Sequence, residues 1–401
     1  MAIQPGSVWL DARGTQSVGH AERGIARYVT EHALALLELA PDAIGWIGLS
    51  PDVPVPPIAE PLERSGKAVR QAADRGPTGE IPPIYHVMSP FEAELGLDEI
   101  WPVWSRGTRL VVTLYDLVPL IMRERYNADW GYMATAWIAR LGLLGSAHQI
   151  LTISQQTADD AMERLNIREE RITVIDSGVS DRFSSLVRTR DQAEQILRSS
   201  LPKVRPGFLL YVGGVDYRKN LEGAIRAYAE LPAAMRDAHQ LVIACNLAQH
   251  LRFSLRAFAQ GLGIESRNLL LTGFVSDRDL AALYRSCELF VFPSLYEGAG
   301  LPILEAMTCG APVAASNTSA IPELLGDLEA TFDPSDPADI ARAVRAVLET
   351  PGKLDALRER SRRRVQLYTW ERVARRTLEG YERALEIPLE SPVPRPLPFR
   401  R

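Results

Sequence analysis

Cysteine is scarce in this sequence, and the few cysteines lack the spacing of a disulfide framework or a metal site. Only three of the 401 residues are cysteine, and none belongs to a Cys-x-x-Cys pair. They are Cys245, Cys287 and Cys309. The six histidines are scattered, without the paired spacing of zinc ligands. We therefore expect reduced, buried thiols and no metal site.

Other features are also missing, and each absence narrows the functional class. The net charge is −5, whereas a general nucleic-acid binder is usually basic, so we expect no nucleic-acid partner. A secretory signal and an apolar run of about 20 residues, the length of a membrane span, are both lacking, so we expect a cytoplasmic protein. The dehydrogenase-type Gly-x-Gly-x-x-Gly is also absent, which disfavours a nicotinamide cofactor.

What the sequence does contain is a regular alternation of short apolar runs and amphipathic stretches. Hydrophobic residues make up 46% and charged residues 24% of the chain, as in soluble enzymes. The alternation is typical of βαβ units with a parallel sheet, and the length favours two domains. The expected strands are 7–10, 44–49, 84–88, 110–115, 150–153 and 173–175 in the first half, and 208–212, 240–245, 269–271, 289–292, 312–315 and 330–332 in the second.

This pattern fades in a polar stretch that separates two Rossmann-like halves. We expect a first domain at 1–187, a linker at 188–206 with a short helix, and a second domain at 207–370. A terminal helix at 371–386 is expected to pack back on the first domain, and the proline-rich tail 387–401 to form an extended arm. Open α/β sheets bind ligands beyond the carboxyl ends of their strands, so the loops that follow strands are the places to search.

The most informative of these loops follows the expected strand 289–292 and leads into a helix. Glycines at Gly298 and Gly300 allow the backbone to approach a ligand closely. The N–H groups of Ala299, Gly300 and Leu301 would then point at an anion beside the positive end of the helix dipole. This arrangement predicts a phosphate site at the start of the helix.

Two glutamates flank this loop, with seven residues between them. Glu305 lies about one turn inside the expected helix, where its carboxylate can accept hydrogen bonds from the two hydroxyls of a ribose. Glu297 precedes the helix and faces the region where a sugar beyond the phosphates would lie. The alternative interpretation is a helix-capping carboxylate and a surface glutamate.

A second loop, after the expected strand 208–212, carries two adjacent cations. Gly214 lets the chain turn sharply, and Arg218 and Lys219 follow just before a helix. Each cation would stabilise charge on a departing diphosphate by about 4 kcal/mol at about 4 Å and an effective dielectric near 20, before desolvation is counted. The alternative is a solvated pair at a helix start.

Both loops resemble motifs of a known enzyme family. The two glutamates are similar to the E-x7-E motif of family 4 glycosyltransferases, which are retaining enzymes of GT-B architecture. Residues 213–221 are similar to the G-x-x-x-x-(R/K)-K-N loop of the same family. The resemblance implies an α/β fold with two Rossmann-like, doubly wound parallel-sheet domains facing a central cleft, the one at 1–187 binding the acceptor and the one at 207–370 binding the donor. It also implies that the helix end binds the donor diphosphate, Glu305 the ribose and Glu297 the donor sugar.

Weaker similarities extend to other loops of the donor site. Residues 272–277 resemble the segment that reads the nucleotide base, which implies that Phe274 or Val275 lines the base pocket. The glycine loop that contains Gly19 is similar to the first glycine loop of the family, which touches both diphosphate and acceptor.

The expected acceptor side departs from the family pattern. Tyr115 stands where the family often has histidine, which leaves Asp116 as the nearest candidate to orient or deprotonate the acceptor. The alternative for Asp116 is a turn-forming residue that caps the next helix. His86 is either an acceptor-site residue or a core histidine. Asp176 occupies a place that the family commonly gives to proline.

Together these observations predict a retaining transferase that moves a hexosyl group from a GDP-, UDP- or TDP-sugar to a glycan or a lipid-linked sugar, as in bacterial surface polysaccharide synthesis. Mannose and rhamnose are the candidate sugars, and neither a cofactor nor a metal is expected. Aromatic residues in 123–147 leave open a peripheral contact with the inner face of the cell membrane, with core or dimer contacts as the alternative. The competing functions are a non-catalytic nucleotide-sugar-binding subunit and an epimerase or phosphorylase on the same scaffold.

Overall fold

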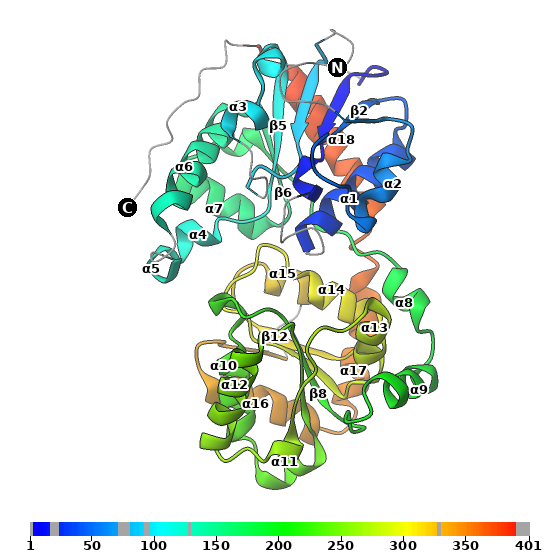
Figure 1. The fold of residues 1–401 in the computed structure, drawn as a ribbon, viewed down its shortest axis with the longest axis vertical. Helices are drawn as coiled ribbons and strands as arrows, with labels where there is room; N and C mark the ends of the chain where they lie inside the picture. Colours follow the sequence, from blue (N-terminus) through cyan, green and yellow to red (C-terminus); the bar gives the residue numbers. More distant parts are fainter. Residues whose placement is uncertain are drawn as a thin grey trace. The chain divides into compact units, whose positions relative to one another are not determined.

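The chain forms two compact units, each built on its own parallel sheet (Figure 1). The computed structural model describes residues 3–16, 24–70, 81–91, 96–126, 130–326 and 330–389. Unit 1 comprises Met1–Gly178 and Thr369–Arg401, and unit 2 comprises Val179–Tyr368. The predicted α/β class with two doubly wound sheets is confirmed.

Unit 1 contains a seven-stranded sheet in the order β3-β2-β1-β4-β5-β6-β7. All of its strand pairs are parallel. The strands are β1 Val8–Asp11, β2 Ile44–Leu49, β3 Ala68–Arg70, β4 Ile84–Val87, β5 Arg109–Leu114, β6 Gln149–Thr152 and β7 Ile172–Val174. The sequence predicted six of these to within about a residue and missed β3, a short edge strand without an apolar run.

The helices of unit 1 include one from each of its two chain segments, packed side by side. Helices α1 (Gly24–Leu39) and α18 (Trp370–Glu386) are in contact, and α18 also contacts β4 to β7. Figure 1 shows this terminal helix within unit 1. The other helices are α2 Glu60–Glu63, α3 Leu97–Ile100, α4 Val118–Ile121, α5 Arg123–Tyr126, α6 Trp130–Ser146 and α7 Gln155–Leu165.

Unit 2 contains a six-stranded sheet in the order β10-β9-β8-β11-β12-β13. Its strands are β8 Leu209–Val212, β9 Leu241–Ala244, β10 Leu269–Leu271, β11 Leu289–Phe292, β12 Val313–Ser316 and β13 Thr331–Phe332. All of its pairs are parallel too. Every predicted strand of this half is present, with ends that differ by a residue or two.

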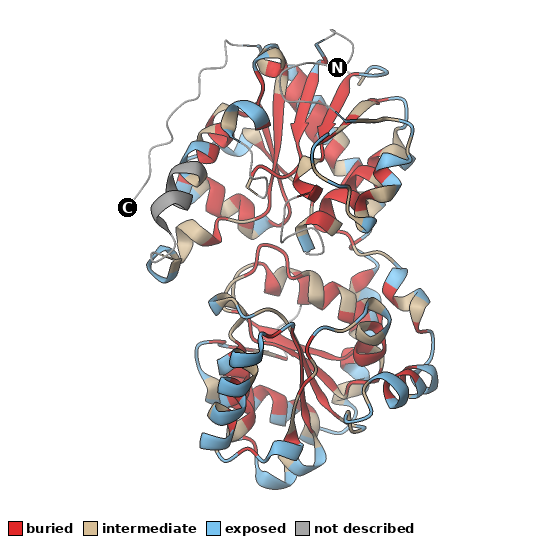
Figure 2. Cartoon of the chain, viewed as in Figure 1, coloured by how far each residue is buried: buried red, intermediate tan, exposed pale blue. Residues whose placement is uncertain are grey.

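Both faces of the second sheet are covered, which explains its continuous apolar strands. Leu210 and Phe290 lie in the core beneath α9, α13, α14 and α17, whereas Leu209 and Val291 lie in the core beneath α10, α12 and α16. Figure 2 shows the strands as the buried centre of the unit. The helices are α8 Arg182–Leu186, α9 Arg190–Ser200, α10 Leu221–Glu230, α11 Ala233–Ala238, α12 Gln249–Gly261, α13 Asp277–Ser286, α14 Leu301–Thr308, α15 Ile321–Leu325, α16 Pro337–Glu349 and α17 Lys353–Val365.

The segment 188–206, expected as a linker, lies inside unit 2. It carries α9, whose buried face packs against α13. The chain passes between the units at Gly178–Val179 and again at Tyr368–Thr369. The N–H of Val179 donates to the carbonyl of Tyr368 at 3.1 Å, so the two passages are hydrogen-bonded to each other.

Candidate functional site

The loop after β8 is shaped by polar contacts close to the two predicted cations. Asp216 Oδ1 accepts a hydrogen bond from the backbone N–H of Arg218 at 3.0 Å and so caps a 3-10 turn, Tyr217–Lys219. Asn220 follows with φ of +54°, a left-handed conformation that asparagine tolerates. Its amide donates to the carbonyls of Pro293 (3.0 Å) and Pro334 (2.7 Å). These contacts fix the loop against the one that follows β11.

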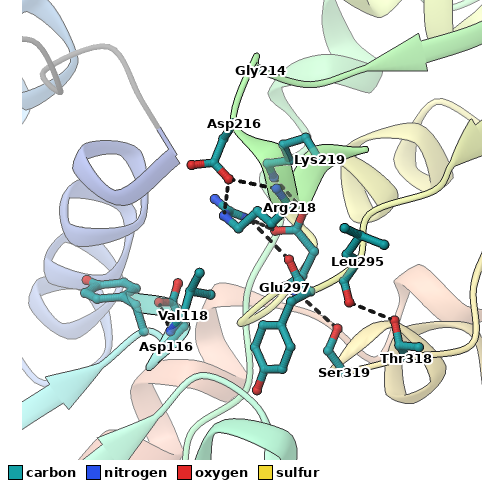
Figure 3. A network of polar contacts seen from close by, with 12 residues as sticks. Asp116, Val118, Gly214, Asp216, Arg218, Lys219, Leu295, Glu297, Thr318 and Ser319 are labelled. Carbon is teal, nitrogen blue, oxygen red and sulfur yellow. Dashed lines mark hydrogen bonds and ion pairs between the residues drawn. The ribbon is translucent and has the colours of Figure 1, made fainter. Parts of the chain in front are cut away.

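The loop after β11 is held between two neighbouring loops. The N–H of Leu295 donates to the carbonyl of Arg218 at 2.7 Å, which joins the loops after β8 and β11 directly. On the other side, Thr318 Oγ1 donates to the carbonyl of Leu295 (3.2 Å), and Ser319 Oγ accepts from the N–H of Glu297 (3.0 Å). Both serve to position the backbone from which Glu297 projects, as Figure 3 shows.

Helix α14 begins as the sequence predicts. Gly300 is its N-cap with φ of +80°, in the left-handed region that glycine adopts without steric cost. Leu301 opens the helix, and a proline occupies one of the first two positions, where its missing N–H costs no hydrogen bond. Gly298 and Ala299 are buried in the preceding turn. This geometry fits the anion site predicted at the amino end of α14, which stays a prediction.

Glu297 lies between the two cations (Figure 3). One carboxylate oxygen accepts from Arg218 Nη1 at 2.7 Å, and the other accepts from Lys219 Nζ at 2.6 Å. The side chain of Glu297 is 7% exposed, against 22% for Arg218 and 15% for Lys219. Lys219 Nζ also lies 5.6 Å from the ring centroid of Phe292, the last residue of β11. The structure thus brings both predicted cations and the first glutamate together beside α14.

Burial and mutual attraction set the protonation behaviour of this cluster. Burial raises the pKa of the Glu297 carboxyl, but Lys219 and Arg218 outweigh that effect and hold the pKa below its ordinary value. Burial lowers the pKa of the Lys219 ammonium, and Glu297 only partly offsets this. The two cations of the site are paired with two carboxylates, because Asp216 Oδ1 also lies 3.5 Å from Arg218 Nε.

The second glutamate lies inside α14, on a partly exposed position. Glu305 Oε2 accepts a hydrogen bond from the hydroxyl of Tyr284, on the neighbouring helix α13, at 3.2 Å. Burial, followed by the charge of Glu305, raises the pKa of Tyr284 well above its ordinary value, so the tyrosine stays a donor. This contact orients the carboxylate that the sequence assigns to a ribose.

Of the two side chains expected to line the base pocket, one is exposed to solvent. Phe274 is 71% exposed, whereas Val275 is partly buried against the hydrophobic core that includes α13 and α14. Both follow β10, on the same edge of the sheet as Gly214, which follows β8. Their roles as base-binding and turn residues stay predictions.

The loops that carry these side chains occur in a known family. The model described as Glycosyltransferase Family 4 matches residues 23–183, and the model described as Glycosyl transferases group 1 matches residues 192–364. The chain belongs to the family 4 glycosyltransferases. The predicted resemblance is therefore confirmed across both units.

Relatives of this family 4 glycosyltransferase include curated mannosyltransferases. Serotype-specific mannosyltransferase WbdA of Escherichia coli is 32% identical over 322 residues, which are 80% of this chain and 39% of WbdA. O-antigen chain mannosyltransferase B of Escherichia coli is 29% identical over 246 residues, which are 60% of this chain and 61% of that protein. This chain thus spans less than two thirds of either relative.

Solved structures share the fold of this family 4 glycosyltransferase at low sequence identity. Sucrose-phosphate synthase from Thermosynechococcus elongatus superposes with a TM-score of 0.69 at 21% identity, over 94% of this chain and 98% of that one. The likeness supports the shared two-domain fold.

The predicted acceptor residues of the glycosyltransferase lie in unit 1. Asp116 Oδ1 accepts from the N–H of Val118 at 3.0 Å, at the start of α4, as expected of a turn-forming aspartate. Tyr115 is buried, and its hydroxyl donates to the carbonyl of Met88 at 2.9 Å. Gly19 lies outside the described residues. Neither finding tests a catalytic role for Asp116, which stays a prediction.

His86 is a core histidine. It is fully buried, with Nδ1 2.7 Å from the hydroxyl of Tyr381 and Nε2 2.8 Å from Thr113 Oγ1. Burial lowers its pKa well below the ordinary value, so both ring nitrogens serve neutral hydrogen bonds. Of the two alternatives, the core interpretation is the one that the structure favours.

The unusual Asp176 has a physical explanation in unit 1. Its φ is +62°, which proline, locked near −65°, cannot adopt. Its carboxylate accepts from Arg376 of α18 at 2.8 Å and lies 3.3 Å from Arg372 of the same helix. Asp176 therefore anchors the terminal helix to the loop after β7.

Sequence reasoning missed the residues that position the site. Thr318, Ser319 and Tyr284 act on backbone or carboxylate groups that lie far from them in the sequence. Ordinary serines, threonines and tyrosines carry no pattern that distinguishes such contacts. Asn220 had a signal, because it completes the predicted lysine–asparagine motif.

The described residues hold no group of three or more His, Cys, Asp or Glu side chains arranged to bind a metal.

An Asp-x-Asp triplet opens α13, where Asp277 pairs with Arg182 (3.0 Å) and Asp279 accepts from the hydroxyl of Ser276 (2.7 Å). The triplet therefore lies in the first turn of a helix that Ser276 caps. In the part of the chain that the structure describes, no helix is both long and apolar enough to cross a membrane.

Proposed function

We propose that this family 4 glycosyltransferase transfers a hexosyl group from a nucleoside diphosphate sugar to a sugar hydroxyl of a glycan or lipid-linked oligosaccharide. Mannose is the first candidate, because the relatives described above are named mannosyltransferases. Bacterial polysaccharide synthesis is the proposed setting, since those names include an O-antigen chain. The supporting observation is the buried cluster of Glu297, Arg218 and Lys219 beside the amino end of α14.

The cluster suits departure of a diphosphate. When the bond between the anomeric carbon and the diphosphate oxygen breaks, the electron pair stays with the diphosphate. Arg218, Lys219 and the backbone N–H groups at the amino end of α14 would stabilise the added charge, and preorganised donors of this kind contribute most in the transition state. Because these are fixed cations, we propose that no divalent metal is required.

Retention follows if the acceptor attacks from the face that the diphosphate leaves. The acceptor oxygen would form the new bond to the anomeric carbon, and its proton would pass to the departing diphosphate oxygen. Glu297, ionised and paired with two cations, is poorly suited to act as a covalent nucleophile. It is better placed to hold the cations and a donor-sugar hydroxyl.

The test is donor turnover with and without acceptor, in the presence of EDTA. GDP-mannose, UDP-glucose and TDP-rhamnose are incubated with the protein, and nucleoside diphosphate release and the anomeric configuration of the product are measured. Acceptor-dependent release with a retained anomer supports the proposal. Sugar phosphate formation, an altered nucleotide sugar, or binding without release would instead indicate a phosphorylase, an epimerase or a non-catalytic subunit.

A matched pair of lysine variants links the activity to the site. Lys219→Ala should lower kcat by about 10²–10³-fold, the effect of removing one preorganised transition-state donor. Lys203→Ala removes an exposed lysine of the same unit and should leave kcat unchanged. Equal activity of the wild type and both variants would overturn the site assignment.

A further inference from the structure

We propose that Arg252 selects the donor nucleotide and that its guanidinium reads the O6 and N7 edge of guanine. This inference rests on the proposed function, because it concerns the nucleoside end of the same donor site. Its basis is an unpartnered guanidinium at the edge of the unit 2 sheet where a bound nucleotide would end.

Arg252 lies in the first turn of α12, and its guanidinium packs on the backbone at the end of β10. A Cβ added to Gly273 would lie 2.5 Å from Arg252 Nη2. Gly273 also has φ of +82°, a left-handed conformation that favours glycine. The end of the Arg252 side chain therefore lies against the backbone of a glycine at the end of β10.

The guanidinium has no hydrogen-bond or ion-pair partner among the residues that the structure describes, and its Nε is buried. Arg285 shares these properties, but it lies near Gly310, beyond the carboxyl end of α14. Arg252 is thus an unpartnered guanidinium with a buried Nε at the ligand-binding edge of the sheet. The terminal N–H groups of Arg252 have no acceptor among the described residues, which leaves them available to an acceptor on a ligand.

The direction of a bound nucleotide follows from the sheet order. The proposed diphosphate site follows β8 and β11, and Glu305 and Tyr284 join α14 to α13, the helix that begins after the Gly273 loop. Strand β10 lies three places from β11, or about 14 Å at about 4.8 Å per strand. A nucleotide with its diphosphate at α14 and its ribose near Glu305 therefore places its base beside Gly273 and Arg252.

The chemistry of the guanidinium then favours one base. Its forked N–H groups match two adjacent acceptors, and guanine presents O6 and N7 side by side. Adenine replaces O6 with an amino donor, and uracil or thymine offers a single carbonyl on that edge. The exposed ring of Phe274 lies next to Gly273 in the chain and is available to pack against the base.

Isothermal titration calorimetry with GDP and UDP tests the proposal on the whole chain. Wild type should bind GDP more tightly than UDP. Arg252→Ala should weaken GDP binding by about 10- to 100-fold, the range for losing one bidentate base contact, and change UDP binding little. Arg252→Lys keeps the charge but loses the fork, so it should also lose the preference for GDP.

Two controls sharpen the result. Arg256→Ala removes an exposed arginine one turn further along α12 and should leave both affinities unchanged. The 7-deaza analogue of GDP lacks the N7 acceptor, so wild type should bind it more weakly than GDP, and Arg252→Ala should distinguish the two far less.

The inference and the proposed function fail in different ways. If wild type prefers UDP, or if Arg252→Ala weakens GDP and UDP equally, the role of Arg252 is overturned while the donor site stands. If wild type binds none of GDP, UDP and TDP, the proposed function falls together with the inference.

Discussion

Glu297 neutralises half of the positive charge that surrounds it. Its carboxylate is fully engaged by one ammonium and one guanidinium, at 2.6 and 2.7 Å. A diphosphate that enters the site must share those cations with the carboxylate. This competition weakens the hold of the site on its own product, which favours product release.

We therefore expect Glu297→Gln to bind a nucleoside diphosphate more tightly and to turn over donor more slowly. Removing a repulsion of roughly 1–3 kcal/mol between carboxylate and diphosphate corresponds to about 5- to 150-fold in affinity. Titration calorimetry and steady-state turnover measure the two effects. Weaker diphosphate binding in the variant would contradict this account of the charge balance.

The buried ammonium of Lys219 should also limit activity at high pH. Because burial lowers its pKa, its charge is present below a pKa that lies under that of an ordinary lysine and is lost as the pH rises through it. The pH dependence of kcat/KM, which reports the free enzyme, should therefore show an alkaline decline. Lys219→Arg should lack that decline, because arginine stays protonated. A decline that survives in the arginine variant belongs to another group.

At the scale of elements, α18 is attached to unit 1 by buried polar contacts. His32 Nε2 lies 2.8 Å from Thr377 Oγ1, and His86 Nδ1 lies 2.7 Å from the hydroxyl of Tyr381, both on that helix. Burial lowers the pKa of His32 to about 3 and that of His86 well below its ordinary value. Both histidines are therefore neutral in the folded unit.

Unit 1 should consequently lose stability in mild acid. Below about pH 6.5 the unfolded chain binds a proton at each histidine and the folded chain does not, so stability falls as pH drops from about 6.5 toward 3. Together the two histidines should lower the free energy of unfolding by up to about 2.7 kcal/mol for each pH unit of acidification. Urea unfolding at several pH values between 7.5 and 5.5, monitored by tryptophan fluorescence, measures this change in the free energy of unfolding. The signal reports unit 1, because all seven tryptophans lie there.

Matched histidine variants provide the control for that measurement. His32→Gln removes about one proton from the uptake on unfolding. The free energy of unfolding should then depend less on pH, by roughly 1.4 kcal/mol per pH unit. His250→Gln, on an exposed position of unit 2, should leave this pH dependence unchanged. The same pH dependence in all three proteins would show that carboxylates, not these histidines, cause the acid sensitivity.

The elements that the sequence predicted are those with strong local signals. Apolar runs such as Leu289–Phe292 and the glycine loop before α14 depend on neighbours in the chain, so they could be read directly. The strand Ala68–Arg70 could not, because a short, partly exposed edge strand needs no apolar run. The pairing of Glu297 with Lys219 depends on residues 78 apart, and no local pattern encodes it.

At the scale of the whole molecule, the units differ in how the chain builds them. Unit 2 is one continuous segment with a core on each face of its sheet, and these are properties of a domain that folds alone. Unit 1 needs α18, which buries Val373, Ala374 and Tyr381 and is separated from the rest of that unit by all of unit 2.

We therefore expect a fragment of residues 179–368 to fold and to bind a nucleoside diphosphate. Circular dichroism should show a cooperative melt, and GDP or UDP should raise the midpoint. The same fragment with Lys219→Ala should melt cooperatively and respond less to nucleotide. A fragment of residues 1–178 should not fold, since the surfaces that α18 covers would be bare. A stable 1–178 fragment would refute this view of α18.

The return of the chain to unit 1 also sets an order of events during synthesis. Domains made first usually fold first on the ribosome. Here the part of unit 1 that is translated before unit 2 still lacks α18. Unit 2 can therefore complete its core while unit 1 is unfinished. A chain that stops short of Trp370 would release a native second unit tethered to an incomplete first one, which chaperones or proteases would then have to handle.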